Sequence, residues 1–165
     1  MSSFKIAPGI AWRRITAIIK TRYINQLRFS SAPKTAAYAS IKVGYKCEKY
    51  LTALQFRGKE RRLLTQIRTG AHALNSERGR HLRSRSGVRP ADAKLCQCCN
   101  MGAVEDPQHF IFECNCFDSV RLQFAQLFEK FGTVRTFLNS DVPEAVASYL
   151  YSCHTFRQQH LLTVQ

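Results

Sequence analysis

Five of the seven cysteines lie between positions 96 and 116, and this clustering limits the fold more than any other feature of the sequence. Cys96 and Cys99 form a C-x2-C pair, nine residues separate Cys99 from His109, and four separate His109 from Cys114. A C-x2-C turn directs two thiolates toward one point, and zinc takes four sulfur or nitrogen ligands in a tetrahedron. The spacing therefore predicts one zinc ion held by Cys96, Cys99, His109 and Cys114.

A site whose four positions are all filled by protein side chains has no place for a bound water, so the predicted zinc is structural. Cys98 can replace either member of the C-x2-C pair if the turn shifts, and Cys116 can replace Cys114. The competing interpretation is a chance cluster of buried thiols near a histidine that makes ordinary hydrogen bonds. The remaining cysteines, Cys47 and Cys153, fall in helical patterns and fit small core residues.

Charge is divided unevenly along the chain, whose formal net charge is +14. Residues 1–95 hold 21 Lys and Arg but only 4 Asp and Glu, whereas residues 96–165 hold 4 and 7. A basic first half thus precedes a mildly acidic, cysteine-bearing second half. Such a positive field attracts polyanions and predicts RNA or DNA as the partner, with binding that weakens as salt rises. Solubility is the competing explanation, although it rarely needs charge this one-sided.

The cysteine count and the N-terminal residues indicate the compartment. An odd number of cysteines argues against a disulfide scaffold, and Trp12, Arg13 and Arg14 interrupt any secretory signal. No apolar run approaches the ~20 residues that cross a bilayer, so no membrane partner is expected. We expect an intracellular protein, nuclear or cytoplasmic. Mitochondrial targeting is the alternative, because residues 1–47 are basic and lack acidic side chains.

Apolar residues recur at helical spacing through most of the chain, and strand signals are weak. Helices are expected over 9–29, 34–44, 46–55, 59–69 and 119–131, and over a last segment that opens near Asp141 and Pro143. Residues 75–93, rich in Ser, Gly, Pro and Arg, are expected to form an exposed loop. The predicted fold class is mainly α: a small helical domain with a CCHC zinc-knuckle-like loop and, at most, a short hairpin around the zinc.

These patterns divide the chain into four segments. They are a basic helical arm (1–57), a basic helix with an Arg-rich loop (58–93), a zinc-binding module (94–118) and C-terminal helices (119–165). The side chains expected to face the core from 119–131 are Val120, Leu122, Phe124, Leu127, Phe128 and Phe131.

No catalytic constellation is found in the sequence. Its four aspartates are widely separated, so the paired aspartates of a two-metal polymerase site are missing. Ser84, Ser86 and His81 are close in sequence but have no Gly-x-Ser-x-Gly elbow. Neither an H-E-x-x-H motif nor a Walker-type glycine loop occurs. We therefore expect an accessory region rather than an enzyme.

Residues 40–121 resemble the C-terminal zinc-binding region of non-LTR (LINE-type) retrotransposon reverse transcriptases. Such tails carry a basic phrase that ends in E-x-G-R, then C-x2-C, an acidic pair, H-x4-C and a later arginine. The matching residues are Lys46 or Lys49, Tyr50, Leu51, Arg62, Leu64, Arg68, Gly70, His72, Leu74, Glu77, Gly79, Arg80, Cys96, Cys99, Glu105, Asp106, His109, Cys114 and Arg121. Arg157, which follows Leu150 in the last predicted helix, is also similar to how these tails end.

The resemblance implies a region that binds template RNA or target DNA beside a polymerase, with a reverse transcriptase as a candidate protein partner. The chain lacks the polymerase and the endonuclease, and Cys98 and Cys116 depart from the usual single ligands. We expect a truncated element product or an independent gene derived from one. The alternatives are a protein-interaction module that docks on a reverse transcriptase and a non-functional remnant.

The candidate nucleic-acid-binding residues lie on the predicted helix 59–69 and in the loop after it. They are Arg61, Arg62, Arg68, His72, Arg78, Arg80, Arg83, Arg85 and Arg89. Arginine forks bind phosphate bidentately and stack on exposed bases. A helix shared by Arg68 and His72 would place both on one face, whereas His72 can instead make local hydrogen bonds.

Side chains beside the predicted ligands have two interpretations each. Phe110 and Phe112 are candidate stacking surfaces for single strands, as is His81, but at least one of the two phenylalanines is expected in the core. Glu105 and Asp106 either hydrogen-bond to His109 or form a solvated turn.

Overall fold

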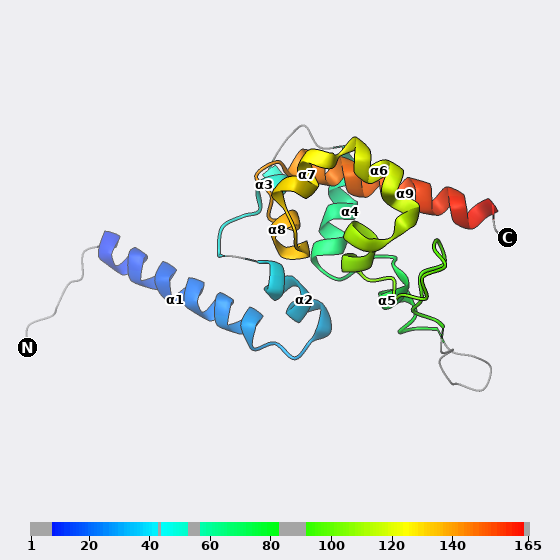
Figure 1. Cartoon of the computed structure of the whole chain (residues 1–165). Helices are drawn as coiled ribbons and strands as arrows, with labels where there is room; N and C mark the ends of the chain where they lie inside the picture. Colours follow the sequence, from blue (N-terminus) through cyan, green and yellow to red (C-terminus); the bar gives the residue numbers. More distant parts are fainter. Residues whose placement is uncertain (1–7, 43, 53–56, 83–91, 164–165) are drawn as a thin grey trace, which may run out of the picture.

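The computed structural model describes residues 8–42, 44–52, 57–82 and 92–163, which form a mainly α-helical fold, as the sequence predicts (Figure 1). The helices are α1 (Pro8–Arg28), α2 (Pro33–Ile41), α3 (Lys49–Thr52), α4 (Gly58–Arg68), α5 (Asn75–Arg78), α6 (Asp118–Gln123), α7 (Ala125–Lys130), α8 (Val134–Leu138) and α9 (Pro143–Thr163). A π-helical turn, His109–Glu113, and a 3-10 turn, Asn115–Phe117, precede α6. The expected hairpin is reduced to a single antiparallel bridge between Leu95 and Val104.

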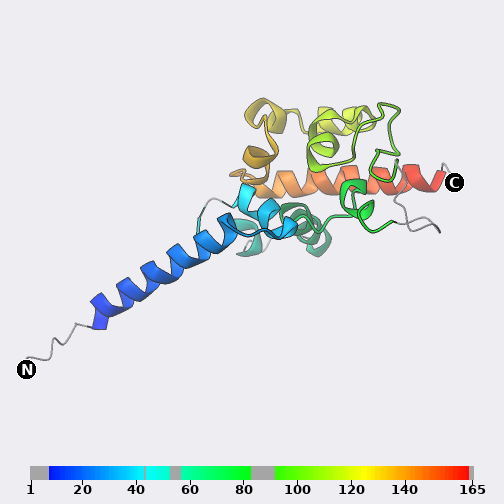
Figure 2. The ribbon, with the colours of Figure 1, turned by 90° about the horizontal axis from the view of Figure 1, so that it is seen from below.

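Helix α9 runs through the middle of the fold and separates two groups of elements (Figure 2). Helices α2 to α5 lie on one side, and residues 92–117 with α6, α7 and α8 lie on the other. Helix α9 contacts both groups, most extensively through α4. Helix α1 projects away from this body and meets it at α2 (Figure 1).

The sequence of α9 explains its central position. Its buried apolar residues, Val146, Tyr149, Leu150 and Cys153, recur at intervals of three and four and form one stripe. Pro143 occupies the first position of the helix, as expected, because its missing N–H is not needed there. One polar residue, Arg157, continues the buried stripe toward the C-terminus.

Helix α4 agrees closely with the predicted helix 59–69. Leu63, Leu64 and Ile67 are buried on the face that meets α9. The helix ends just before Gly70, whose φ of 66° lies in the left-handed region that glycine adopts without steric cost.

The single helix expected over 119–131 is divided at Phe124, where the backbone leaves the helical region (φ −119°, ψ 28°) between α6 and α7. The break allows two aromatic rings, Phe124 and Phe128, to pack on Tyr149 of α9, with centroid distances of 5.7 and 5.1 Å. The same change of direction leaves Leu122 78% exposed, so its predicted core position is wrong. Val120 and Leu127 are buried as predicted.

Other expected elements differ in length. Helix α2 ends at Ile41, before the predicted end at residue 44, and α3 covers one turn of the predicted helix 46–55, part of which lies outside the described residues. Helix α8 was not expected; its start is fixed by a capping box between Thr133 and Thr136. The expected loop 75–93 begins instead with α5 and a buried Asn75.

Buried side chains between Ile41 and Cys153 form one core, to which all four predicted segments contribute. The apolar stripe of α1 takes no part in this core, because the rest of the fold does not cover it. Trp12 is 69% exposed, and Ile15, Ile18 and Ile19 are also exposed. Among the described residues, we find no helix that combines the length and the hydrophobicity needed to cross a membrane.

Candidate metal centre

The predicted ligands come together in the structure. The ligand atoms of Cys96, Cys99, His109 and Cys114 all lie within 4.8 Å of one another, and all four residues are buried. The Sγ atoms of Cys96 and Cys114 are 3.9 Å apart, and Cys99 Sγ is 3.4 Å from His109 Nε2. A tetrahedron with metal–sulfur bonds of ~2.3 Å and metal–nitrogen bonds of ~2.0 Å has edges of about 3.5–3.8 Å. This grouping can therefore hold a metal ion.

Local backbone structure delivers the four ligands from two short segments. The bridge next to Cys96 closes the loop that carries the C-x2-C pair, because the Cys96 N–H donates to the carbonyl oxygen of Ala103 (2.8 Å). Gly102 allows the reversal with a φ of 64°. In the second segment, the Cys114 N–H donates to the carbonyl oxygen of His109 (2.8 Å), so that the π-helical turn brings the two ligands to one side.

Electrostatics at the cluster place the negative charge on one sulfur, that of Cys96, and keep its neighbours Cys98 and Cys114 protonated. Thiols of Cys114 and Cys98 donate to the Cys96 sulfur and lower the pKa of Cys96, while the same bond and burial raise the pKa of Cys114. The protons are thus shared unequally among crowded sulfurs, and a bound cation would displace them all. Arg121 of α6 donates to the carbonyl oxygens of Ile111 and Cys114 and fixes the chain beside the last ligand.

Cys98 and Cys116, the two possible replacement ligands, lie beside the cluster and outside its four-ligand set. Cys116 donates its thiol to the carbonyl oxygen of Cys98, which directs the Cys116 sulfur away from the ligand position. The buried Cys98 groups instead with Cys96 and the carboxylate of Glu105. The Glu105 carboxylate in this three-residue group is already paired with Arg157, so it is not a free oxygen ligand. The group also has three members, one fewer than a tetrahedral zinc site needs.

Glu105 is the centre of a buried network that the sequence pattern did not indicate. Its carboxylate accepts from Nε (2.5 Å) and Nη2 (2.7 Å) of Arg157, on α9, and from the backbone N–H of Asn75 (2.8 Å), on α5. Asn75 also donates its side-chain amide to the carbonyl oxygen of Leu95, next to the first ligand. The network therefore ties the loop that carries the ligands to two helices.

One member of the acidic pair hydrogen-bonds to His109, and it does so through the backbone and not through the ring. Glu105 faces Arg157, while Asp106 accepts from the backbone N–H of His109 (2.9 Å) and so caps the turn. The carboxylate nearest the ring is that of Glu113, 3.7 Å from Nδ1. At this distance the two groups do not hydrogen-bond, and the buried Nδ1 has no hydrogen-bond partner among the described residues.

Two of the predicted nucleic-acid-binding residues are buried, and the assignment of Arg68 is corrected. The buried guanidinium of Arg68 donates to Glu48 (2.8 Å) and to the carbonyl oxygen of Leu138, and it stacks over Tyr50. His72 is 8% exposed and follows the end of α4, so it shares no helix with Arg68. A guanidinium that is buried and paired in this way holds elements together and does not reach phosphate.

The other predicted residues are distributed between surface and undescribed positions. Arg62, Arg78 and Arg80 are exposed, and Arg61 is partly buried. Arg83, Arg85 and Arg89 lie outside the described residues. Of the candidate stacking residues, His81 is exposed, whereas both phenylalanines, Phe110 and Phe112, pack in the core against Phe117 and Phe128, respectively.

Comparison of the chain with models of protein families, with curated proteins and with solved structures found no match. The site is thus described by its own geometry: three sulfurs and one imidazole nitrogen, all buried and all within 4.8 Å of one another, which can hold a metal ion.

Proposed function

We propose that the protein is a zinc-stabilised module that binds RNA or DNA, similar in role to the C-terminal tail of a LINE-type reverse transcriptase. The observation that carries the proposal is the buried grouping of Cys96, Cys99, His109 and Cys114. The nucleic-acid part of the proposal rests on the positive charge of the residues before position 96.

The ligand chemistry favours zinc. Three thiolates and one imidazole suit soft or borderline ions, whereas magnesium and calcium take oxygen ligands. All four ligand positions come from buried side chains, which leaves no open position for substrate or water and is typical of a structural zinc. The ion would stabilise a segment, residues 94–118, whose only regular structure is one bridge and two short turns.

Charge supports the polyanionic partner. Of the 25 Lys and Arg residues, 21 precede position 96, where only 4 acidic residues accompany them. Arg62, Arg78 and Arg80 present part of this charge at the surface. Each cation that contacts a phosphate releases a counterion from the nucleic acid, so binding should depend steeply on salt.

Zinc binding is tested by native mass spectrometry of the full chain and of two serine variants. We expect one zinc per wild-type chain, loss of the ion in Cys99→Ser, and retention in Cys116→Ser, because only Cys99 belongs to the four-ligand set. Cys116→Ser controls for the general effect of removing a thiol from this cluster. A wild-type chain that folds without metal contradicts the proposal.

Nucleic-acid binding is tested by fluorescence anisotropy with labelled single-stranded RNA over a salt series. For three phosphate contacts we expect the affinity to fall about twentyfold between about 50 and 200 mM salt. Affinity that stays flat over this range, or no binding at low salt, rules out the nucleic-acid part of the proposal while leaving the zinc site intact.

A protein-interaction module is the second candidate, and the exposed stripe of α1 is the observation that favours it. Trp12, Ile15, Ile18 and Ile19 present apolar area that the body does not cover. This reading predicts co-purification with a reverse transcriptase that survives nuclease treatment and is lost in Ile15→Asp. Loss of the partner on nuclease treatment favours the nucleic-acid function instead.

A further inference from the structure

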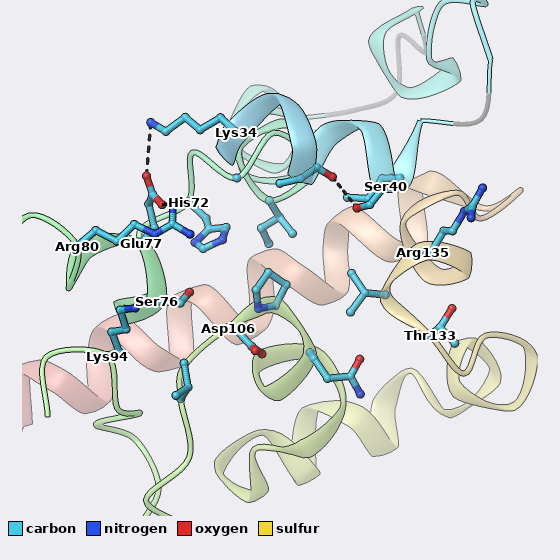
Figure 3. Close-up of a pocket in the computed structure, with 18 residues that line it drawn as sticks. Lys34, Ser40, His72, Ser76, Glu77, Arg80, Lys94, Asp106, Thr133 and Arg135 are labelled. Atoms are coloured by element: carbon cyan, nitrogen blue, oxygen red, sulfur yellow. Dashed lines mark hydrogen bonds and ion pairs between the residues drawn. The ribbon is translucent and has the colours of Figure 1, made fainter. Parts of the chain in front are cut away.

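A cavity of about 820 Å³ opens where α2, the turn after α4, α5, the metal-binding loop and the segment before α8 meet. Figure 3 shows that these elements, distant in sequence, each contribute side chains to its wall. The residues directly before His109, Asp106 to Gln108, form part of the lining, so the wall is continuous with the candidate metal centre. The volume lies within the ~300–1,000 Å³ typical of ligand-binding pockets.

The lining carries more positive than negative charge. Its four cations are Lys34, Arg80, Lys94 and Arg135, and its two carboxylates are Glu77 and Asp106. Glu77 is held between two of the cations, 3.5 Å from Lys34 and 3.3 Å from Arg80. The Asp106 carboxylate is engaged by the His109 backbone. A cavity of this composition favours an anion over a neutral ligand.

Two cations of the lining are available to a ligand. Among the described residues, neither Lys94 nor Arg135 has an ion-pair partner, and Arg135 is exposed. Figure 3 places Arg135 across the cavity from Lys94 and Arg80. Cations on opposite walls can contact successive phosphates of a strand that passes between them.

Neutral hydrogen-bonding groups complete the wall. Ser40, Ser76 and Thr133 contribute hydroxyl groups, and the His72 ring lies between the two sides (Figure 3). His72 Nδ1 has no hydrogen-bond partner within the described protein. Burial lowers the pKa of His72, so at neutral pH the ring is uncharged and can both donate and accept hydrogen bonds. Such groups suit the polar edges of an unpaired base.

We propose that this cavity binds a short segment of single-stranded nucleic acid, with phosphates held by Lys94 and Arg135 on its two sides. The inference rests on the proposed nucleic-acid function and assigns its binding site. Concavity selects the single strand, because a duplex is read by helices or ribbons that protrude into its grooves, whereas a pocket takes bases that are splayed out. Of the nine residues that the sequence suggests for nucleic-acid binding, His72 and Arg80 line this cavity, whereas Lys94 and Arg135 are not among them.

The experiment compares the zinc-loaded full chain with three glutamine variants. Lys94→Gln and Arg135→Gln each remove one cation from the cavity. Lys130→Gln is the matched control, because Lys130 is exposed, lies five residues from Arg135, and is already paired with Asp141 at 2.8 Å outside the cavity. Binding is measured by anisotropy with a labelled RNA of about 12 nucleotides, within the site size of single-strand binders, and with a duplex of the same sequence.

Each cavity variant should flatten the slope of log affinity against log salt by about 0.7, the contribution of one phosphate contact to a single strand. Lys130→Gln should leave the slope unchanged, and the single strand should bind more tightly than the duplex. Cavity variants that match Lys130→Gln overturn the inference, as does a preference for duplex; in both cases the proposed function stands, because the wild-type chain still binds. If the wild-type chain binds no RNA, both the cavity inference and the proposed nucleic-acid function are refuted.

Discussion

Replacing Arg157 with methionine removes one side of the buried ion pair that joins α9 to the metal-binding loop. The Arg157 and Glu105 side chains are 4% and 1% exposed, so the remaining carboxylate has no access to water. In Arg157→Met, the Asn75 backbone N–H is the one donor to the Glu105 carboxylate that remains among the described residues. Leaving one charge of a buried pair without its partner costs about 3–5 kcal/mol.

For a chain of this size, that loss lowers the melting temperature by about 6–20 °C. The assay is thermal unfolding of the zinc-loaded chain, followed by circular dichroism at a helical wavelength. Lys130→Met is the control, because it breaks a solvent-exposed pair with Asp141 and should leave the melting temperature unchanged.

A double variant separates the charge effect from lost packing. Glu105→Leu combined with Arg157→Met leaves no unpaired buried charge, so it should recover a large part of the stability lost in the single variant. Equal melting temperatures for Arg157→Met and the wild type refute the view that this pair anchors the loop. A double variant less stable than Arg157→Met would show that packing around the arginine stem dominates.

Three further outcomes are expected from the same structure. Leu127→Ala should cost about 2–5 kcal/mol in denaturant unfolding because its side chain is buried, whereas Leu122→Ala, at an exposed position, should leave the unfolding midpoint unchanged. Burial raises the pKa of Cys153 to about 12, so its thiol stays protonated and should resist alkylation at mildly basic pH while exposed Cys47 reacts, as mass spectrometry of peptides would detect. Acidification should release the metal, because protons compete for the ligand sulfurs and the pKa of Cys114 is raised; metal content that stays constant on lowering the pH contradicts this.

The features predicted correctly from the sequence depend on local spacing. Helices α4 and α9 follow from apolar residues three and four positions apart and from terminal Gly70 and Pro143. The grouping of the four ligands follows from a turn and a loop within 19 residues, 96–114. The single helix predicted over 119–131 was wrong for the same reason: the spacing of its apolar residues fits one long helix as well as the two short helices α6 and α7.

Features that depend on distant partners could not be predicted. Glu105 and Arg157 are 52 positions apart, and Arg68 donates to a carbonyl oxygen 70 positions away. The sequence does not distinguish an arginine that binds phosphate at the surface of a helix from one that is buried and ion-paired in the core. The burial of Arg68 and Arg157 therefore means that counting basic residues overstates the cationic surface available to a nucleic acid.

The candidate metal centre and the proposed binding cavity share one segment of backbone, which links their chemistry. Asp106 caps the turn that carries His109, and the residues between them line the cavity. A metal that holds His109 in place thereby also holds this wall at a fixed distance from Arg135 of α8, on the opposite side of the cavity. Because the ion would act through the position of the wall and not by touching the ligand, its removal should weaken nucleic-acid binding even though every phosphate-binding side chain remains.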